Sequence, residues 1–321
     1  MPKHSIVMTT YNRSHLILRS IRSVLAQLET DWELIVVLDG CTDNTDEVVA
    51  RYHDPRIKMV VRKENSADEG NRIGRAIEPT NDGLRVVQGH YISHLDDDDI
   101  YLPLRLKRAG DELDWSRKLD AVYCDSLVHY QLNGKEMCKL MFSKDFDAKR
   151  LMERNYIRTP EMTYRRDVLR KVGAWELKCP MADGKTIKPK RHGRVASDWW
   201  YWKKMLTKLP DLKVKHLQFA DVEVFSWTSA LYNDVAYAPQ EITEEMITPE
   251  WCGQTGDPKE FKVEEFYDGA DWSESIASQI ADKVAEQRAM LKERFAGRDV
   301  SNPSADSDVM PTCREDCHAD N

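Results

Sequence analysis

The sequence predicts an α/β protein in which helices flank a mostly parallel sheet, and three observations support this prediction. Strand-like and helix-like segments alternate over the first 105 residues, an order typical of parallel sheets because each strand returns through a crossover helix. The run at residues 33–38 is almost continuously apolar, as expected for a strand that helices cover on both faces. Four consecutive aspartates, residues 96–99, follow another apolar run, at the edge where such sheets bind ligands.

Local patterns predict each element of the first third of the chain. Short apolar and β-branched runs predict strands at residues 5–10, 33–38, 57–62 and 91–95. The first helix begins at the capping residue Ser14, and its apolar positions recur with helical spacing from Ile17 to Leu28. Asn44 and Glu47 resemble a capping box that opens a second helix, and a polar helix is expected at about residues 67–77.

The pattern changes after Pro103. A helix is expected at about residues 104–114, and Asn133-Gly134 predicts a hairpin that joins extended runs at 121–132 and 135–141. The elements expected beyond the hairpin are, in order, a basic loop at 180–194, an aromatic helix at 199–209, a strand at 214–219 and a long polar helix at about 273–295.

Composition argues against several classes of protein. The chain has 321 residues, of which 41% are hydrophobic and 32% are charged, so it can form a core and is not a disordered chain. Its net charge of −8 argues against a protein whose main task is to coat nucleic acid. It has no apolar run near the roughly 18–20 residues of a membrane span and no signal-peptide pattern, and its seven cysteines are scattered. We therefore expect a cytoplasmic protein without an integral membrane segment.

The acidic run is the strongest functional signal. Four adjacent carboxylates repel one another, so their folding into one segment calls for a cation or for hydrogen-bond donors. In extended geometry Asp96 and Asp98 share a face, and hard oxygen ligands suit Mg²⁺ or Mn²⁺. The structural alternative is a solvated acidic loop in which Asp99 caps a helix.

Two further loops follow predicted strands. After the second strand, the Asp39 carboxylate could accept a hydrogen bond from a nucleobase N–H, with Gly40 allowing close approach. After the first strand, Tyr11 could stack on a base. Each loop is also consistent with an ordinary strand-to-helix turn.

Together, these motifs resemble the family 2 glycosyltransferases of GT-A fold. The resemblance rests on VMTTYNR, SIRSVLAQ, WELIVVLDGCTDNT, YHDPRIKMVV and YISHLDDDDIYLP, in matching order and spacing from Ile6 to about Pro103, and it continues more weakly to Asp198 and Trp202. It implies a GT-A-type, Rossmann-like sheet with an acceptor-side subdomain and a helical C-terminal extension.

The resemblance also implies roles for individual residues. Those expected to contact the nucleotide are Thr9, Tyr11, Asp39, Arg72, Asp96 and Asp97. Asp98 is expected to ligate Mn²⁺ or Mg²⁺ together with Asp96, with His216 as a third candidate ligand, and Asp198 falls where the family places its catalytic base. The chain departs from the family at Leu38, where an Asp is common, and at Ser197, where a further carboxylate often stands. It also lacks the family's glycine-rich stretch before the fourth strand, which bears on Arg72.

These implications define the expected function: a metal-dependent inverting glycosyltransferase that moves a sugar from a nucleoside-diphosphate sugar, with a UDP-sugar favoured, to an acceptor hydroxyl. A catalytically silent nucleotide- or glycan-binding scaffold of the same fold is one alternative. A sugar nucleotidyltransferase is another, although residues 9–13 replace the glycine-rich loop expected of that class. The acceptor is open among a glycan, a lipid carrier, a protein and a modified nucleic acid, and self-association is open as well.

The expected parts of the chain are a nucleotide-sugar-binding half at 1–103, an acceptor-binding half at 104–236, an extension at 237–300 and a disordered tail at 301–321.

Overall fold

The computed structural model describes residues 1–66, 76–132, 135–141, 145–153, 155–176, 179–180, 186–187, 197–225, 285, 286 and 289. The expected tail at 301–321 lies outside these residues, and so do the expected extension at 237–300, apart from three positions, and most of the basic loop at 180–194.

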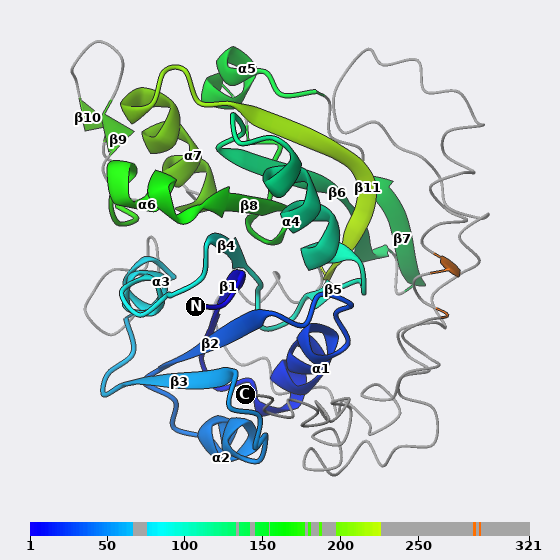
Figure 1. Cartoon of the computed structure of the whole chain (residues 1–321). Coiled ribbons are helices and arrows are strands. Elements are labelled where there is room, and N and C mark those ends of the chain that lie inside the picture. The colour runs from blue at the N-terminus through cyan, green and yellow to red at the C-terminus, as the bar shows by residue number, and fades with distance from the viewer. Residues whose placement is uncertain are drawn as a thin grey trace, which may run out of the picture.

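One mixed sheet organises the described residues (Figure 1). Its strands lie in the order β3, β2, β1, β4, β8, β6, β11, β5, and β7 pairs with β6. Their bounds are β1 His4–Thr10, β2 Trp32–Asp39, β3 Ile57–Arg62, β4 Tyr91–His94, β5 Ile100–Tyr101, β6 Ala121–Leu132, β7 Lys135–Met141, β8 Met162–Arg165 and β11 Val214–Phe225. A separate two-stranded sheet pairs β9 Cys179–Pro180 with β10 Thr186–Ile187.

Helices occupy the connections between these strands. Their bounds are α1 Ser14–Leu25, α2 Thr45–Ala50, α3 Ile77–Leu84, α4 Arg105–Trp115, α5 Ala148–Glu153, the 3₁₀ turn η1 Thr159–Glu161, α6 Arg166–Val172 and α7 Ser197–Lys208.

The sheet is parallel where the alternating pattern predicted it. Strands β3, β2, β1 and β4 are mutually parallel, so their carboxyl ends lie at one edge. Strand β8, which the sequence pattern did not predict, enters antiparallel between β4 and β6. Strand β11 is parallel to β6 and extends to Phe225, beyond the predicted end at residue 219.

Helix α3, Ile77–Leu84, begins where the polar helix expected at about residues 67–77 was to end. The structure forms a helix there because Pro79 lies in the first turn, where a missing N–H costs no intrahelical hydrogen bond. Gly83 lets the helix approach the sheet, since a Cβ at this position would lie 2.6 Å from Val7 Cγ1. Residues 67–75, most of the expected polar helix, lie outside the described part.

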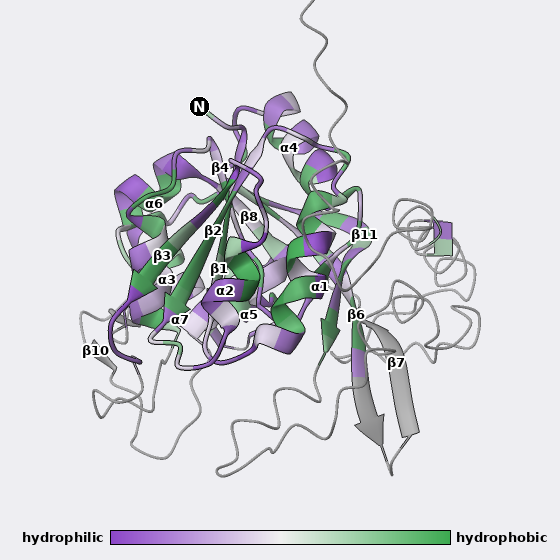
Figure 2. Cartoon of the chain, turned by 90° about the horizontal axis from the view of Figure 1, so that it is seen from below, coloured by the Kyte–Doolittle hydropathy of each residue, from purple (hydrophilic) through white to green (hydrophobic). Residues whose placement is uncertain are grey.

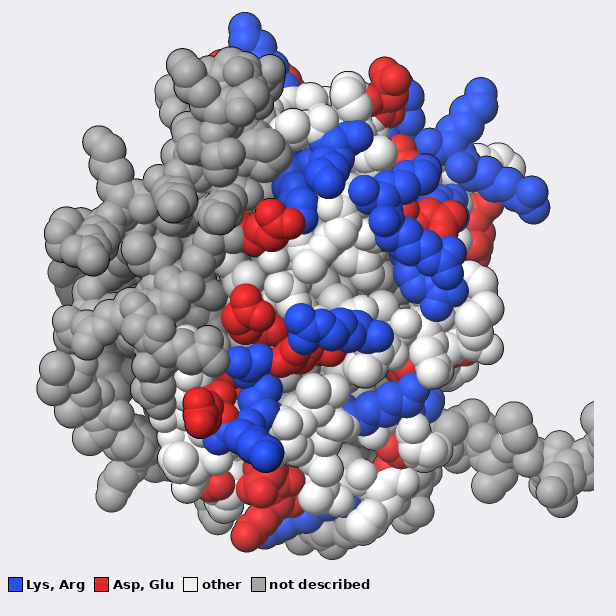
Figure 3. Space-filling model, turned by 90° about the vertical axis from the view of Figure 1, so that its left-hand side faces the viewer, with Lys and Arg blue, Asp and Glu red and all other residues white. Residues whose placement is uncertain are grey.

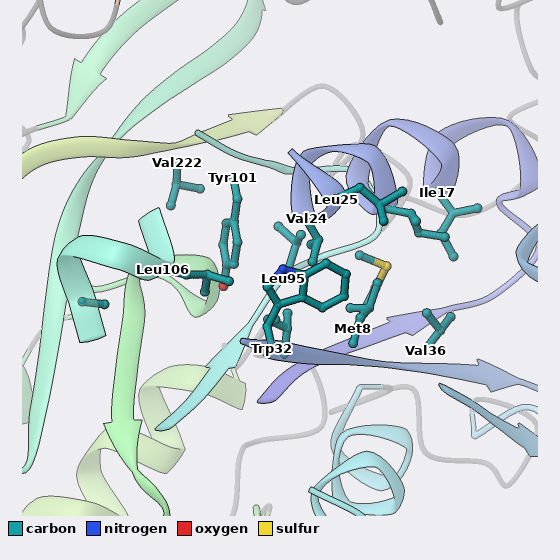
Figure 4. Packing of buried hydrophobic residues seen from close by; sticks show 14 of the residues in the cluster. Met8, Ile17, Val24, Leu25, Trp32, Val36, Leu95, Tyr101, Leu106 and Val222 are labelled. Atoms are coloured by element: carbon teal, nitrogen blue, oxygen red, sulfur yellow. The ribbon is translucent and has the colours of Figure 1, made fainter. Parts of the chain in front are cut away.

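The core has two parts because successive residues of a strand point to opposite faces of the sheet. Ile6 and Met8 of β1 join a cluster with α1 and with Trp32, Tyr101 and Val222 (Figure 4). Val7 joins a second cluster formed with α3, α6 and α7. Hydrophobic residues accordingly fill the central strands, whereas hydrophilic residues lie on the outer helices (Figure 2).

The surface carries charges of both signs. On the face drawn in Figure 3, Lys and Arg side chains are interspersed with Asp and Glu. Among the helices of the described residues, none has both the length and the apolar character that crossing a membrane requires.

Candidate active site

The acidic segment, residues 96–99, leaves the sheet at the carboxyl end of β4. The Leu95 N–H still donates to Val7 O of β1 at 3.1 Å, and the chain then turns into β5, which pairs with β11. The Tyr101 hydroxyl donates back to His94 O at 2.5 Å and closes this turn. The turn places the four carboxylates at the shared edge of the parallel strands.

Helix α1 holds the backbone of this segment through its polar side. Ser20 Oγ donates to Asp97 O at 2.9 Å, and Arg19 donates to Asp98 O. At the far end of the turn, Ser23 Oγ accepts from Tyr101 N at 3.1 Å, and Gln27 Nε2 donates to Leu102 O at 2.9 Å. The apolar side of α1 packs in the core, so this helix is buried on both sides.

Arg13 is the cation that contacts two of the carboxylates directly. Its Nη1 lies 2.7 Å from Asp97 Oδ1 and 2.9 Å from Asp98 Oδ2. The Arg13 N–H donates to Thr45 Oγ1 at 3.1 Å, which fixes the loop that carries it. One guanidinium thus offsets part of the charge of four adjacent aspartates.

The remaining negative charge perturbs the aspartates. Burial raises the pKa of Asp96 to about 8, and the charges of Asp98, Asp97 and Asp198 add to this effect. Burial and the charges of Asp98 and Asp96 raise the pKa of Asp99, whose Oδ1 accepts from Phe225 N at 3.0 Å. Within the described residues, the carboxylate of Asp96 has no hydrogen-bond donor.

Asp198 lies near the acidic segment, although the two are far apart in the sequence. It is the second residue of α7, it is 7% exposed, and its charge is among those that raise the pKa of Asp96. Asn155 Nδ2 lies 3.4 Å from each of its carboxylate oxygens, and Oδ1 accepts from Trp199 N at 2.7 Å. Burial raises the pKa of Asp198 above its ordinary value.

The loops after β1 and β2 adjoin the same edge of the sheet. Asn12, which has a positive φ of 52°, accepts from Thr42 N at 2.7 Å and joins the two loops. Tyr11 is 43% exposed beside it, whereas Thr9 is half-buried in β1. The loops therefore present an exposed aromatic ring next to the strand that ends in Asp39.

Asp39 is buried, and its carboxylate already has partners within the protein. It is 5% exposed; its Oδ2 accepts from Ser66 Oγ at 2.6 Å, and Arg62 Nε lies 2.8 Å from its Oδ1. Gly40 makes this packing possible: it has a φ of +67°, and a Cβ on it would lie 2.4 Å from Asn65 N. Arg72 lies outside the described residues.

The structure does not bring His216 to the aspartates as a third ligand. His216 is buried in β11, where its Nε2 lies 2.8 Å from Asp125 Oδ1 and its ring stacks on Tyr123 at 4.9 Å between centroids. The end of the same strand reaches the acidic segment instead, through the hydrogen bond from Phe225 to Asp99.

The expected metal ligands Asp96 and Asp98 stay a prediction. Carboxylate oxygens are the donors that Mg²⁺ and Mn²⁺ prefer, and Asp96 presents two oxygens without a donor in the described residues. Across that part of the chain, no three His, Cys, Asp or Glu side chains are grouped so that they could hold a metal ion. Arg13 pairs with one expected metal ligand, Asp98, and with Asp97, which was expected to contact the nucleotide.

Sequence reasoning missed several residues that shape this site: Arg13, Arg19, Ser20, Gln27 and Asn155. One signal for them was present, because Ser20, Ser23 and Gln27 recur at helical spacing on one side of α1. The sequence did not indicate what this polar side would contact.

Comparisons with known proteins agree with this geometry. The model of the family described as glycosyl transferase family 2 matches residues 5–173. Protein CgeD of Bacillus subtilis is 34% identical over 137 residues, which are 42% of this chain and 32% of that protein. The Escherichia coli protein WfgD, a UDP-Glc:alpha-D-GlcNAc-diphosphoundecaprenol beta-1,3-glucosyltransferase, is 37% identical over 103 residues, 32% of this chain and 38% of its own. The chain thus spans about a third of the length of these curated relatives.

A solved structure supports the fold. Residues 1–349 of S. aureus TarS in complex with UDP-GlcNAc superpose with a TM-score of 0.53 at 18% identity, covering 92% of this chain and 76% of that one. The expected GT-A-type α/β fold is confirmed by this likeness and by the family match.

Proposed function

The chain belongs to glycosyl transferase family 2, and from this membership we propose that it transfers a sugar from a nucleoside-diphosphate sugar to an acceptor hydroxyl, with inversion at the anomeric carbon. One observation carries the proposal. The acidic segment after β4 and the buried Asp198 of α7 lie close enough that the charge of Asp198 raises the pKa of Asp96. A site for the diphosphate and a base for the acceptor would therefore share one edge of the sheet.

The donor we propose is a UDP-sugar. Support comes from the relative WfgD, named for transfer from UDP-Glc, and from TarS, whose structure holds UDP-GlcNAc. The exposed ring of Tyr11 would stack on the base, and Thr9 and Asp39 would contribute polar atoms beside it. Arg72 stays part of this proposal as a residue that approaches the nucleotide.

The cofactor we propose is Mn²⁺ or Mg²⁺, held by Asp98 and Asp96, with Asp97 beside the nucleotide. A divalent cation bound there would neutralise charge that develops on the departing diphosphate. The uncompensated carboxylate of Asp96 fits such an ion, because its raised pKa reflects burial and repulsion that a cation would relieve.

Asp198 would act as the general base. A carboxylate that takes the proton of the acceptor hydroxyl raises the rate by about 10²–10⁴-fold when its geometry is right. Burial moves the pKa of Asp198 upward, toward the operating pH, which strengthens it as a base. Asn155 and the Trp199 N–H hold both of its oxygens and would orient the carboxylate.

The first test is a thermal-shift panel of UDP, GDP, CDP, dTDP and ADP, each with Mn²⁺ and with EDTA. A ligand that binds only the folded state stabilises it by about 2.7 kcal/mol at a hundredfold excess over its Kd. We expect UDP to raise the Tm with Mn²⁺ and the Asp98→Asn variant to lose this rise. If no diphosphate shifts the Tm in either condition, the silent scaffold replaces the transferase.

The second test separates binding from chemistry. Asp198→Asn is expected to keep the UDP-dependent Tm rise and to lose UDP release from UDP-sugars by about 10²-fold or more. Full UDP release by this variant would remove Asp198 as the base while leaving the donor site in place.

A further inference from the structure

The contacts of Arg13 bear on how a divalent cation binds to the acidic segment. The inference drawn from them rests on the proposed function. We propose that Arg13 is the internal counter-ion of the acidic segment: it holds Asp97 and Asp98 while no metal is bound, and a divalent cation must displace its guanidinium. Arg13 is then a positioning residue that sets metal affinity and couples metal binding to diphosphate binding.

The geometry places one nitrogen between two carboxylates. Nη1 of Arg13 lies 2.7 Å from Asp97 Oδ1 and 2.9 Å from Asp98 Oδ2, the short distances of charge-assisted hydrogen bonds. The two aspartate side chains are only 6% and 13% exposed, so water screens these pairs weakly. The guanidinium thus occupies the space beside Asp98, the proposed metal ligand, and also holds the neighbouring Asp97.

A guanidinium neutralises the charge of the acidic segment less completely than a divalent cation does. It brings one positive charge to a segment of four aspartates, and the neighbouring Asp96 carboxylate receives no donor from the described residues. A divalent ion brings twice the charge and binds carboxylate oxygens at shorter range. The ion and the guanidinium repel each other, so they cannot both remain between Asp97 and Asp98.

The side chain of Arg13 can move away from the two aspartates while its backbone stays in place. The Arg13 N–H is fixed by Thr45 Oγ1, and the preceding residue, Asn12, joins this loop to Thr42. The Arg13 side chain is 24% exposed, so rotation about its own bonds moves the guanidinium without moving the loop. A nucleoside diphosphate beside the metal would offer it new oxygen acceptors. Metal and diphosphate should therefore bind with strong positive coupling.

Arg19 provides a matched control. It carries the same charge and also reaches the acidic segment, where it donates to the backbone oxygen of Asp98. Its guanidinium lies over the Phe225 ring, 3.9 Å from the centroid. Loss of Arg19 removes positive charge near the segment and leaves the contacts of Arg13 with the carboxylates in place.

The experiment measures Mn²⁺ binding to the full chain without nucleotide, by the electron paramagnetic resonance signal of free Mn²⁺. We expect Arg13→Gln to bind Mn²⁺ about tenfold more tightly than the wild type, and Arg19→Gln to stay within about threefold. We also expect Arg13→Gln to have a lower Tm in EDTA and a larger Tm rise with Mn²⁺. UDP should increase Mn²⁺ affinity less in this variant than in the wild type. Arg13→Met repeats the measurement if Arg13→Gln does not fold.

Two results would overturn the inference. One is unchanged or weaker Mn²⁺ binding by both neutral Arg13 variants. The other is an equal gain of Mn²⁺ affinity in Arg19→Gln, which would mean that loss of any nearby positive charge has the same effect. In either case a Mn²⁺-dependent UDP shift of the wild type would leave the proposed function standing. If no variant binds Mn²⁺ but UDP still shifts the Tm in EDTA, both this inference and the metal assignment fail, while the nucleotide site remains.

Discussion

Replacing Gln27 with Ala tests whether α1 holds the acidic segment in place. Gln27 is 1% exposed and lies where α1, the end of the acidic turn and the start of α4 meet. Its Nε2 donates to Leu102 O at 2.9 Å and to Ser23 O at 3.0 Å, and its Oε1 accepts from Leu106 N at 3.0 Å. Alanine removes all three hydrogen bonds.

The loss of stability in Gln27→Ala depends on which hydrogen bonds the backbone groups still make without the Gln27 side chain. The Leu106 N–H is in the first turn of α4, where no intrahelical acceptor is available, so it loses its partner at a cost of about 1–3 kcal/mol. The carbonyl of Leu102 still accepts from Arg105 N at 2.9 Å, so its loss is limited to a net hydrogen bond, about 0.5–1.5 kcal/mol. The free energy of unfolding should therefore fall by about 3 kcal/mol.

Urea unfolding followed by tryptophan fluorescence measures this change, and Gln88→Ala is the matched control. Gln88 is exposed, and its side chain makes one long contact with Lys58, so its loss should change stability by at most about 0.5 kcal/mol. A lower midpoint with an unchanged m-value is the expected result for Gln27→Ala. A change below about 1 kcal/mol, similar to the control, would refute the reasoning that Gln27 anchors the turn.

Three other predictions concern different parts of the molecule. Glu33→Gln should cost about 1–3 kcal/mol at pH 7, because the buried carboxylate accepts from Ser5 Oγ at 2.5 Å and pairs with Lys58 at 2.7 Å. Although burial raises the pKa of Glu33, these partners lower it overall, so the ionised form favours folding. The Tm difference from the wild type should be full above the ordinary pKa of a Glu, about 4.3, and should shrink as the pH falls through the lowered pKa of Glu33; a constant difference would contradict this. Gly40→Ala should lower stability in urea by at least about 1–3 kcal/mol, since φ is +67° and the new Cβ would meet a backbone atom; unchanged stability would argue against this turn. Because burial raises the pKa of Asp198, the acid limb of the kcat/KM profile should lie above the ordinary value of about 3.9, whereas a limb at or below it would exclude Asp198 as the titrating base.

Much of the fold could be predicted because its signals are local. The apolar run at 33–38 and the helical spacing that starts at Ile17 depend on side chains that are neighbours in sequence. The strand forms there, and helix α1 begins at Ser14 as predicted but ends at Leu25, before Leu28. The Asn-Gly signal likewise predicted the pairing of β6 with β7. Strand β8 was missed because it is four residues long and is stabilised by β4 and β6, which are distant in sequence.

Parts of the candidate site were predictable for the same reason. The acidic segment and the loops at Tyr11 and Asp39 follow strands directly, so the parallel order of β1, β2 and β4 brings them to one edge. His216 was a weaker candidate because it was suggested by the resemblance alone and lies within a strand-like run. The structure buries this side chain against Asp125 within the β6–β11 pair.

The sequence by itself determined the strand-and-helix order, the family resemblance and the placing of four carboxylates at the end of a strand. Tertiary structure alone decided the surroundings of those charges. Arg13 from the loop after β1 pairs with two of the carboxylates, the polar side of α1 holds the backbone, and Asp198 from α7 adds a further negative charge nearby. The physical reason is that a residue pattern sets local conformation, whereas burial, low screening and hydrogen-bond partners arise only when distant segments pack together.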